Sequence, residues 1–289
     1  MPPLASLDQV LIMKIKVKKA SGTVEYLNSN KLRSSLIRSG ADREQANSII
    51  KTIIEEIPPY TTTKKIYSLA RKYLRQINHA SGLRYSLKMA LFRLGPSGYP
   101  FEKYIGEILK HYNYNVQVGI LMNGKCVKHE IDVFAVNDNE VLAVECKYRN
   151  SSVNNTDVKT AMYVHSRFRD LESVIKTAYP GKSFRGMLIT NTRFTSDAIQ
   201  YAECSGMHLK SWRYPETGGL QEMVEAKKLY PVTVISGVKS GLINTLFDKN
   251  IILLKDLAKM KIGQMIKILS LNESKAKNLK QQAEELCIR

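Results

Sequence analysis

Residues 129–148 read HEIDVFAVNDNEVLAVECKY, two apolar arms that flank a polar centre. The centre, residues 137–140, is Asn-Asp-Asn-Glu, and such residues tolerate the backbone conformations of tight turns. A hairpin that closes symmetrically around this turn pairs Val136 with Val141. Because residues 141–144 are too apolar for a solvated edge, the stretch predicts a β-hairpin inside a larger sheet.

Three charged residues interrupt the apolar arms: Asp132, Glu145 and Lys147. The same pairing places Asp132 opposite Glu145, with Cβ atoms roughly 5 Å apart. Lys147 follows Glu145 by two residues and points to the same face of its strand. Two carboxylates and an ammonium are costly on an apolar face unless they have a use. A divalent cation that prefers oxygen ligands is one use; the alternative is an incidental Glu-Lys pair on a surface hairpin.

These residues carry a resemblance to a known family. The motifs Ile-Asp-Val at 131–133 and Val-Glu-Cys-Lys at 144–147 follow a predicted helix at 98–109, which opens with the pair Phe101-Glu102. In this arrangement the chain resembles the PD-(D/E)xK nuclease superfamily, and within it the Mrr-like restriction endonucleases and archaeal Holliday-junction resolvases. The resemblance covers roughly residues 98–230 and implies a restriction-endonuclease-like α/β core of order αβββαβ.

The resemblance also implies a mechanism, the metal-dependent hydrolysis of DNA phosphodiester bonds. Asp132 and Glu145 would hold Mg²⁺ or Mn²⁺, helped by the carbonyl of Cys146. Lys147 would orient the attacking water or stabilise the developing negative charge. Glu102 would help to ligate the ion or a second one.

A second resemblance lies near the N-terminus, where residues 17–32 read VKKASGTVEYLNSNKL and residues 85–94 read YSLKMALFRL. Both stretches are similar to the ATP-cone, a regulatory nucleotide-binding module of ribonucleotide reductases and of a repressor of their genes. The resemblance implies that ATP or dATP binds here and gates cleavage through the oligomeric state. It also implies that the nucleotide is lined by Lys19, Glu25, Asn28, Lys31 and Thr63. A module retained only for packing or oligomerisation is the alternative.

Composition favours a polyanionic partner. The net charge is +18 and the sequence pI is about 9.6, and most of the excess lies outside residues 99–230. Such a charge suits the binding of DNA or nucleotide phosphates. The alternative is that the basic surface serves only solubility. No stretch reaches the roughly 20 apolar residues of a membrane helix, and residues 7–13 are too short for a signal peptide. We therefore expect a cytoplasmic protein.

Cysteines and histidines give no metal-binding pattern. The four cysteines include no C-x-x-C pair and no histidine at ligand spacing, so a zinc site is not expected. Cys146 alternates away from its charged neighbours, which predicts a buried core thiol. His129 and His165 could approach the site, but structural roles suit them better.

The pattern of elements predicts three domains: an ATP-cone at 12–95, mostly helical; a nuclease domain at 98–230; and a helical domain at 231–289. The first is predicted to contain two strands (Lys14–Lys19 and Thr23–Tyr26) and four helices (Ser29–Ser39, Arg43–Ile57, Thr63–Asn78 and Ser81–Leu94). In the second we expect helices at Pro100–Asn113, Asp157–Lys176 and Ser196–Ser205, with strands at Asn115–Leu121, Phe184–Thr190 and Met207–Lys210 around the hairpin.

The third segment resembles a helix-hairpin-helix or SAM-like domain at residues 268–279, which read ILSLNESKAKNL. It lacks the Gly-x-Gly that would bring backbone N–H groups to a phosphate, so DNA binding and a packing role both remain open. Taken together, the sequence predicts a metal-dependent endonuclease, acting on DNA as a homo-oligomer. The alternative is a non-enzymatic, nucleotide-sensing DNA-binding regulator, which leaves Asp132, Glu145 and Lys147 without a use.

Overall fold

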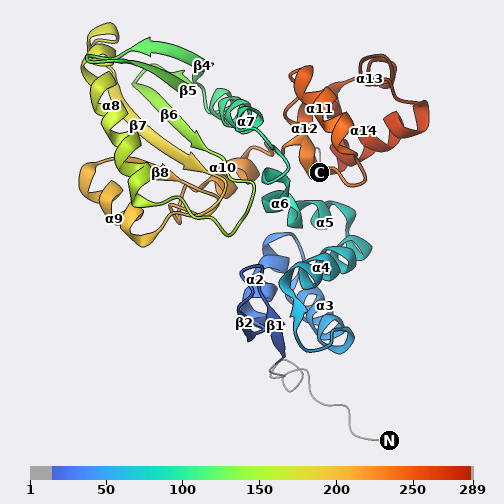
Figure 1. Ribbon diagram of the computed structural model, residues 1–289. Helices are drawn as coiled ribbons and strands as arrows, with labels where there is room; N and C mark the ends of the chain where they lie inside the picture. Colours follow the sequence, from blue (N-terminus) through green and yellow to red (C-terminus); the bar gives the residue numbers. More distant parts are fainter. Residues whose placement is uncertain (1–14, 288–289) are drawn as a thin grey trace, which may run out of the picture. The chain divides into compact units, whose positions relative to one another are not determined.

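The computed structural model describes residues 15–287. Two compact units divide the chain between Leu87 and Lys88 (Figure 1). The apolar stretch 7–13, the predicted start of the first strand at Lys14 and residues 288–289 lie outside the described residues. The division into three domains at 12–95, 98–230 and 231–289 stays a prediction.

The first unit combines a three-stranded sheet, of order β2-β1-β3, with helices. Strand β1 is antiparallel to β2 and parallel to β3. One apolar cluster, in which Leu36, Ile50, Ile53 and Leu74 are fully buried, joins the helices to Val17 of β1. The elements are β1 (Lys16–Lys18), β2 (Val24–Tyr26), α2 (Ser29–Arg38), α3 (Arg43–Glu56), β3 (Thr61–Thr62), α4 (Thr63–Ile77) and α5 (His79–Tyr85).

Helices α2, α3 and α4 begin at polar side chains that cap their free N–H groups. Asn28 accepts from the N–H of Lys31, and Thr62 caps α4 in the same way. Asp42 forms a reciprocal capping box with Gln45 at the start of α3. Each of these three helices begins where the sequence predicts and ends one residue earlier.

The predicted helix Ser81–Leu94 is wrong, because the chain forms two shorter helices there. These are α5 and α6 (Leu87–Leu91). Asn78 ends α4 and also caps α5, accepting from the N–H of Ser81. At the break, the N–H of Ser86 donates to the carbonyl of Leu83 and its hydroxyl donates to the carbonyl of Gly82.

The second unit contains a five-stranded sheet of order β4-β5-β6-β7-β8. Strands β4, β5 and β6 are antiparallel, whereas β7 and β8 join parallel to β6 and to each other. The predicted order αβββαβ is confirmed, with a further helix and strand after it. The elements are α7 (Tyr99–Lys110), β4 (Asn115–Asn123), β5 (Lys128–Val136), β6 (Glu140–Lys147), α8 (Val158–Ala178), β7 (Ser183–Thr190), α9 (Ser196–Ser205) and β8 (His208–Lys210).

Helices cover both faces of this sheet (Figure 1). Val141 and Ala143 of β6 share an apolar cluster with α8 and α9. Leu142, which alternates with them, lies beside α7 instead, so α7 covers the opposite face. Gly186 of β7 permits the close approach of α8, since a Cβ there would lie 2.3 Å from the Phe168 ring.

The remaining elements are helical. Helix α10 (Leu220–Ala226) follows β8 and is absent from the sequence prediction; it is short and starts after Gly218-Gly219. Beyond it lie η1 (Val232–Val234), α11 (Ser240–Asp248), α12 (Leu254–Lys259), α13 (Ile262–Leu269) and α14 (Glu273–Cys287). In the part of the chain that the structure covers, no helix has the length and apolar character needed to cross a membrane.

Candidate active site

Asp132 and Glu145 lie where the central hairpin stops pairing. The predicted pair Val136–Val141 is confirmed, and the ladder between β5 and β6 ends at Val133–Val144. Asp132 and Glu145 are the next residues of the two strands. Here the backbone N–H of Cys146 donates to Asp132 Oδ2 at 2.6 Å, a contact between side chain and backbone.

The opposite edge of β5 is also interrupted at Asp132. Strand β4 pairs through Val118–Val133 and Ile120–Ile131, and Gly119 between them takes no part in the ladder. Gly119 has a φ of +66°, a conformation that glycine adopts far more readily than other residues. Asp132 is therefore set at a local irregularity of the sheet on both sides, the kind of place where a side chain is re-aimed.

Arg167 of α8 binds Glu145. Its guanidinium Nη1 lies 2.5 Å from Glu145 Oε2, and both side chains are mostly buried. The same guanidinium donates to the backbone carbonyl of Glu130 on β5. Arg167 thus connects β5 and β6 beside the carboxylates. No local pattern in the sequence indicates this contact between Arg167 and Glu145.

Glu102 lies in the first turn of α7 and belongs to the same electrostatic cluster. Burial, followed by the negative charges of Asp132, Glu130 and Glu145, raises its pKa to about 7. Burial is also the main cause that raises the pKa of Asp132 to about 6, followed by the charge of Glu145. Burial and neighbouring negative charge therefore both oppose the ionisation of Glu102 and Asp132.

Lys147 is the last residue of β6, and its backbone is hydrogen-bonded there. Its carbonyl accepts from the Thr190 hydroxyl at 2.8 Å, and it is the last residue of β6 to pair with β7. Within residues 15–287 its Nζ atom has no hydrogen-bond or ion-pair partner. The neighbouring Cys146 is buried as predicted, and burial raises its pKa well above the usual value for a thiol.

The residues present suit a hard divalent cation in part. Across residues 15–287, no three or more His, Cys, Asp or Glu side chains are grouped as metal ligands. The predicted metal ligands differ from such a group, because they are two carboxylate side chains and the backbone carbonyl of Cys146. Burial, followed by neighbouring carboxylates, raises the pKa values of Asp132 and Glu102, and a cation bound there would favour their ionised forms. The arrangement is compatible with Mg²⁺ or Mn²⁺.

The two histidines that the sequence placed near the site have structural partners. His129 Nε2 lies 2.7 Å from Asp170 Oδ2, and His165 Nδ1 lies 2.8 Å from the Tyr201 hydroxyl. The sequence prediction overlooked Glu130. Its position two residues before Asp132, on the same face of an alternating strand, was the available signal.

The residues expected to line a nucleotide lie in the first unit. Lys19 and Glu25 form an exposed ion pair at 2.6 Å, which occupies both side chains. Asn28 caps α2 by accepting from the N–H of Lys31. Thr63 is the first residue of α4, next to strand β3, which runs beside β1. Their roles in nucleotide binding stay predictions.

Comparison with known proteins gives two family matches. A model described as "Restriction endonuclease", Mrr_cat, matches residues 95–212, which include Glu102, Asp132, Glu145 and Lys147. A model described as "AF1548-like, C-terminal" matches residues 230–287. The predicted Mrr-like domain is confirmed. For the C-terminal segment, the helix-hairpin-helix or SAM-like resemblance stays a prediction.

One curated relative and one solved structure are similar to the chain. An uncharacterized protein of Archaeoglobus fulgidus is 36% identical over 131 residues, which cover 45% of this chain and 71% of that protein. The solved structure titled "Crystal Structure of Protein of Unknown Function AF1548" is 28% identical with a TM-score of 0.56. The match covers 66% of this chain and 98% of that one. The chain therefore belongs to the same family as the Archaeoglobus fulgidus protein, and its residues 95–212 form a restriction endonuclease domain.

Proposed function

We propose that the protein is a metal-dependent endonuclease that hydrolyses phosphodiester bonds of DNA. One observation carries this proposal: Asp132 and Glu145 lie together at the end of the β5–β6 ladder, inside the region that matches the restriction endonuclease family. The ammonium of Lys147 lies at the end of the same strand as Glu145. The net charge of +18 supports a polyanionic substrate.

Each residue would have a separate task. Asp132, Glu145 and the carbonyl of Cys146 would hold Mg²⁺ or Mn²⁺, and Glu102 would add a further carboxylate. When bound, the ion would polarise the scissile phosphate and lower the pKa of a water molecule. The Lys147 ammonium, which pairs with no carboxylate among residues 15–287, would stabilise negative charge that develops on the phosphate.

Cleavage of plasmid DNA by the purified protein tests this proposal. Wild-type protein should cut with Mg²⁺ or Mn²⁺ and not in a chelator. Lys147→Ala should slow cutting roughly 10²- to 10³-fold, with DNA binding retained. A matched control is Lys267→Ala, which removes the same charge from an exposed position on α13. Equal rates for wild type and Lys147→Ala would remove Lys147 from the mechanism, and no cutting of any DNA would favour the non-enzymatic regulator.

We also propose that ATP or dATP binds the first unit and gates cleavage through the oligomeric state. Support comes from the parallel pairing of β1 with β3, which sets Thr62, at the start of α4, beside Lys18. A helix N-terminus next to lysines favours phosphate groups. Sedimentation with and without each nucleotide tests the idea, because gating requires different affinities for the two states. An unchanged particle and an unchanged cleavage rate would contradict it.

A further inference from the structure

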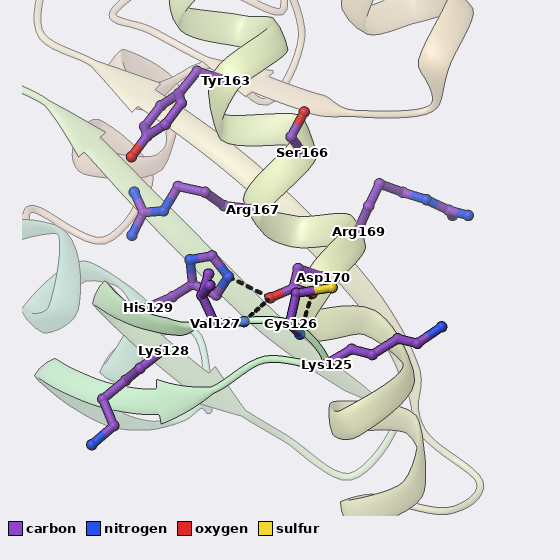
Figure 2. Close-up of a pocket in the computed structure, with 10 residues that line it drawn as sticks. All are labelled: Lys125, Cys126, Val127, Lys128, His129, Tyr163, Ser166, Arg167, Arg169 and Asp170. Carbon is purple, nitrogen blue, oxygen red and sulfur yellow. Dashed lines mark hydrogen bonds and ion pairs between the residues drawn. The ribbon is translucent and has the colours of Figure 1, made fainter.

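A hollow of about 660 Å³ lies between α8 and the connection from β4 to β5 (Figure 2). Its size falls within the roughly 300–1,000 Å³ typical of small-ligand pockets. None of the residues assigned above to catalysis lines it. The lining residues are Lys125, Cys126, Val127, Lys128, His129, Tyr163, Ser166, Arg167, Arg169 and Asp170.

The wall formed by the β4–β5 connection is held in place by Asp170 of α8. Its carboxylate accepts from the N–H groups of Cys126, at 2.8 Å, and Val127, at 3.2 Å, and contacts His129 Nε2 at 2.7 Å. Gly124 packs against the same carboxylate, since a Cβ there would lie 2.0 Å from Asp170 Oδ2. Asp170 therefore fixes the position of this connection, and its carboxylate is already hydrogen-bonded.

The hollow also presents aromatic and apolar surface to solvent. Tyr163 is 66% exposed and Val127 is 60% exposed. The guanidinium of Arg167 lies 5.8 Å from the centre of the Tyr163 ring. An exposed ring with a cation beside it offers the stacking surface that single-stranded nucleic-acid sites use for bases.

Cations flank the hollow. Lys125 and Lys128 are exposed, and their ammonium groups have no partner among residues 15–287. Arg169 is 68% exposed and pairs with Glu172. In Figure 2, Lys128, Tyr163 and Arg167 extend toward one side of the view, whereas Lys125 and Arg169 extend toward the other. Positive charge therefore lies on both sides of a hollow that contains an aromatic ring.

The hollow adjoins the candidate catalytic carboxylates through Arg167. This residue lines the hollow and, with the same guanidinium, binds Glu145 at 2.5 Å. A strand that occupies the hollow would therefore bring its neighbouring phosphates toward Asp132 and Glu145.

We propose that this hollow binds an unpaired nucleotide of the DNA substrate, with its base against Tyr163. The flanking phosphates would lie at Lys128 on one side and at Lys125 and Arg169 on the other. In duplex DNA the faces of the bases are stacked on one another, so an aromatic ring reaches them only where a base is unpaired. The inference rests on the proposed function in taking DNA as the substrate, and it specifies DNA with a single-stranded overhang, gap or branch as the substrate class.

Binding measured in a chelator tests this inference without cleavage. The probes are a duplex with a single-stranded overhang and a blunt duplex of the same length. The overhang carries 2-aminopurine, whose fluorescence falls when it stacks on a ring. Wild-type protein should bind the overhang duplex more tightly and quench the probe. Tyr163→Ala should weaken overhang binding roughly 5- to 150-fold, abolish the quenching and leave blunt-duplex affinity unchanged.

Two variants control for effects of substitution that do not involve the aromatic ring. Tyr163→Phe keeps the ring and should retain affinity and quenching, whereas Met162→Ala alters an exposed neighbour on α8 that does not line the hollow. Lys128→Gln should lower affinity for the overhang duplex more than for the blunt duplex. Equal wild-type affinity for the two probes, a parallel loss in Tyr163→Ala, or no binding of either probe would overturn the inference.

These results distinguish failure of the binding proposal for the hollow from failure of the proposed nuclease activity. If overhang binding depends on Tyr163 but the protein never cuts DNA, the proposed nucleotide site stands and the proposed nuclease activity is refuted. If the protein cuts DNA with a metal ion but shows no preference for unpaired DNA, the nuclease activity stands and the nucleotide site is refuted.

Discussion

Replacing Asp132 with Asn should stabilise the metal-free protein. The pKa of Asp132 is raised from 3.8 to about 6 by burial and by the charge of Glu145, so the folded state disfavours the ionised form. About two pKa units correspond to an upper limit of about 3 kcal/mol. Solvent reaches the partly exposed carboxylate and screens it, so a gain of about 1–2 kcal/mol in the free energy of unfolding is expected. The amide oxygen can still accept the hydrogen bond from the Cys146 N–H.

The stability that Asp132→Asn gains over wild type should increase as the pH rises. Because the folded-state pKa is raised, folded wild-type protein binds more protons than unfolded protein between pH 3.8 and about 6. Wild-type stability therefore falls as pH rises through this window and is lowest, relative to the variant, above it. The advantage of Asp132→Asn should be complete at about pH 7.5 and shrink as the pH falls toward 4.

The fluorescence of Trp212 provides the assay. It is the single tryptophan of the chain, it is buried, and it belongs to the same unit as Asp132. In a chelator the variant should melt higher, by about 2–4 °C for each kcal/mol in a unit of this size. Added Mg²⁺ should then raise the melting temperature of wild type and not of Asp132→Asn, since only wild type keeps the ligand.

A control comes from Asp256→Asn on α12, where burial also raises the carboxyl pKa. This variant should gain stability in a chelator while keeping the response to Mg²⁺. Two results would refute the reasoning about Asp132. One is a lower melting temperature for Asp132→Asn in a chelator. The other is an equal Mg²⁺ response in variant and wild type.

Three further changes have defined outcomes. Arg167→Gln leaves Glu145 without its cation, so the melting temperature in a chelator should fall and the response to Mg²⁺ should grow; an unchanged response would contradict competition between Arg167 and the ion. Gly119→Val forces a φ of +66° on a β-branched residue and should cost about 1–2 kcal/mol or more of unfolding free energy, measured by Trp212 fluorescence; no loss would show that β4 adjusts. Asp170→Ala frees two N–H groups of the β4–β5 connection, so their hydrogen exchange should accelerate while that of β6 stays unchanged. Equal exchange in variant and wild type would contradict this prediction.

The hairpin at 129–148 could be predicted because its pattern is local. A polar turn between apolar arms determines the pairing of Val136 with Val141, and alternation along each arm then brings Asp132 and Glu145 together. The same locality explains why Asn28, Asp42 and Thr62 predict helix starts correctly, because a cap depends on the first turn alone.

Features that depend on distant packing were not predictable in this way. Arg167 meets Glu145 because α8 crosses the sheet there, with Phe168 against Gly186, and no local pattern indicates that approach. The break between α5 and α6 at Ser86 was not indicated either. Apolar residues continue at helical spacing on both sides of it, so the pattern predicts one uninterrupted helix.

The double contact of Arg167 has a thermodynamic consequence. One guanidinium serves Glu145 and lies at the rim of a basic hollow, so it cannot serve a DNA phosphate fully without giving up part of its hold on the carboxylate. If the proposed function holds, a phosphate that attracts the guanidinium would raise the affinity of Glu145 for a cation. By linkage, the cation would raise the affinity for that phosphate by the same factor. Substrate and ion would then load together, so that neither alone assembles the complete site.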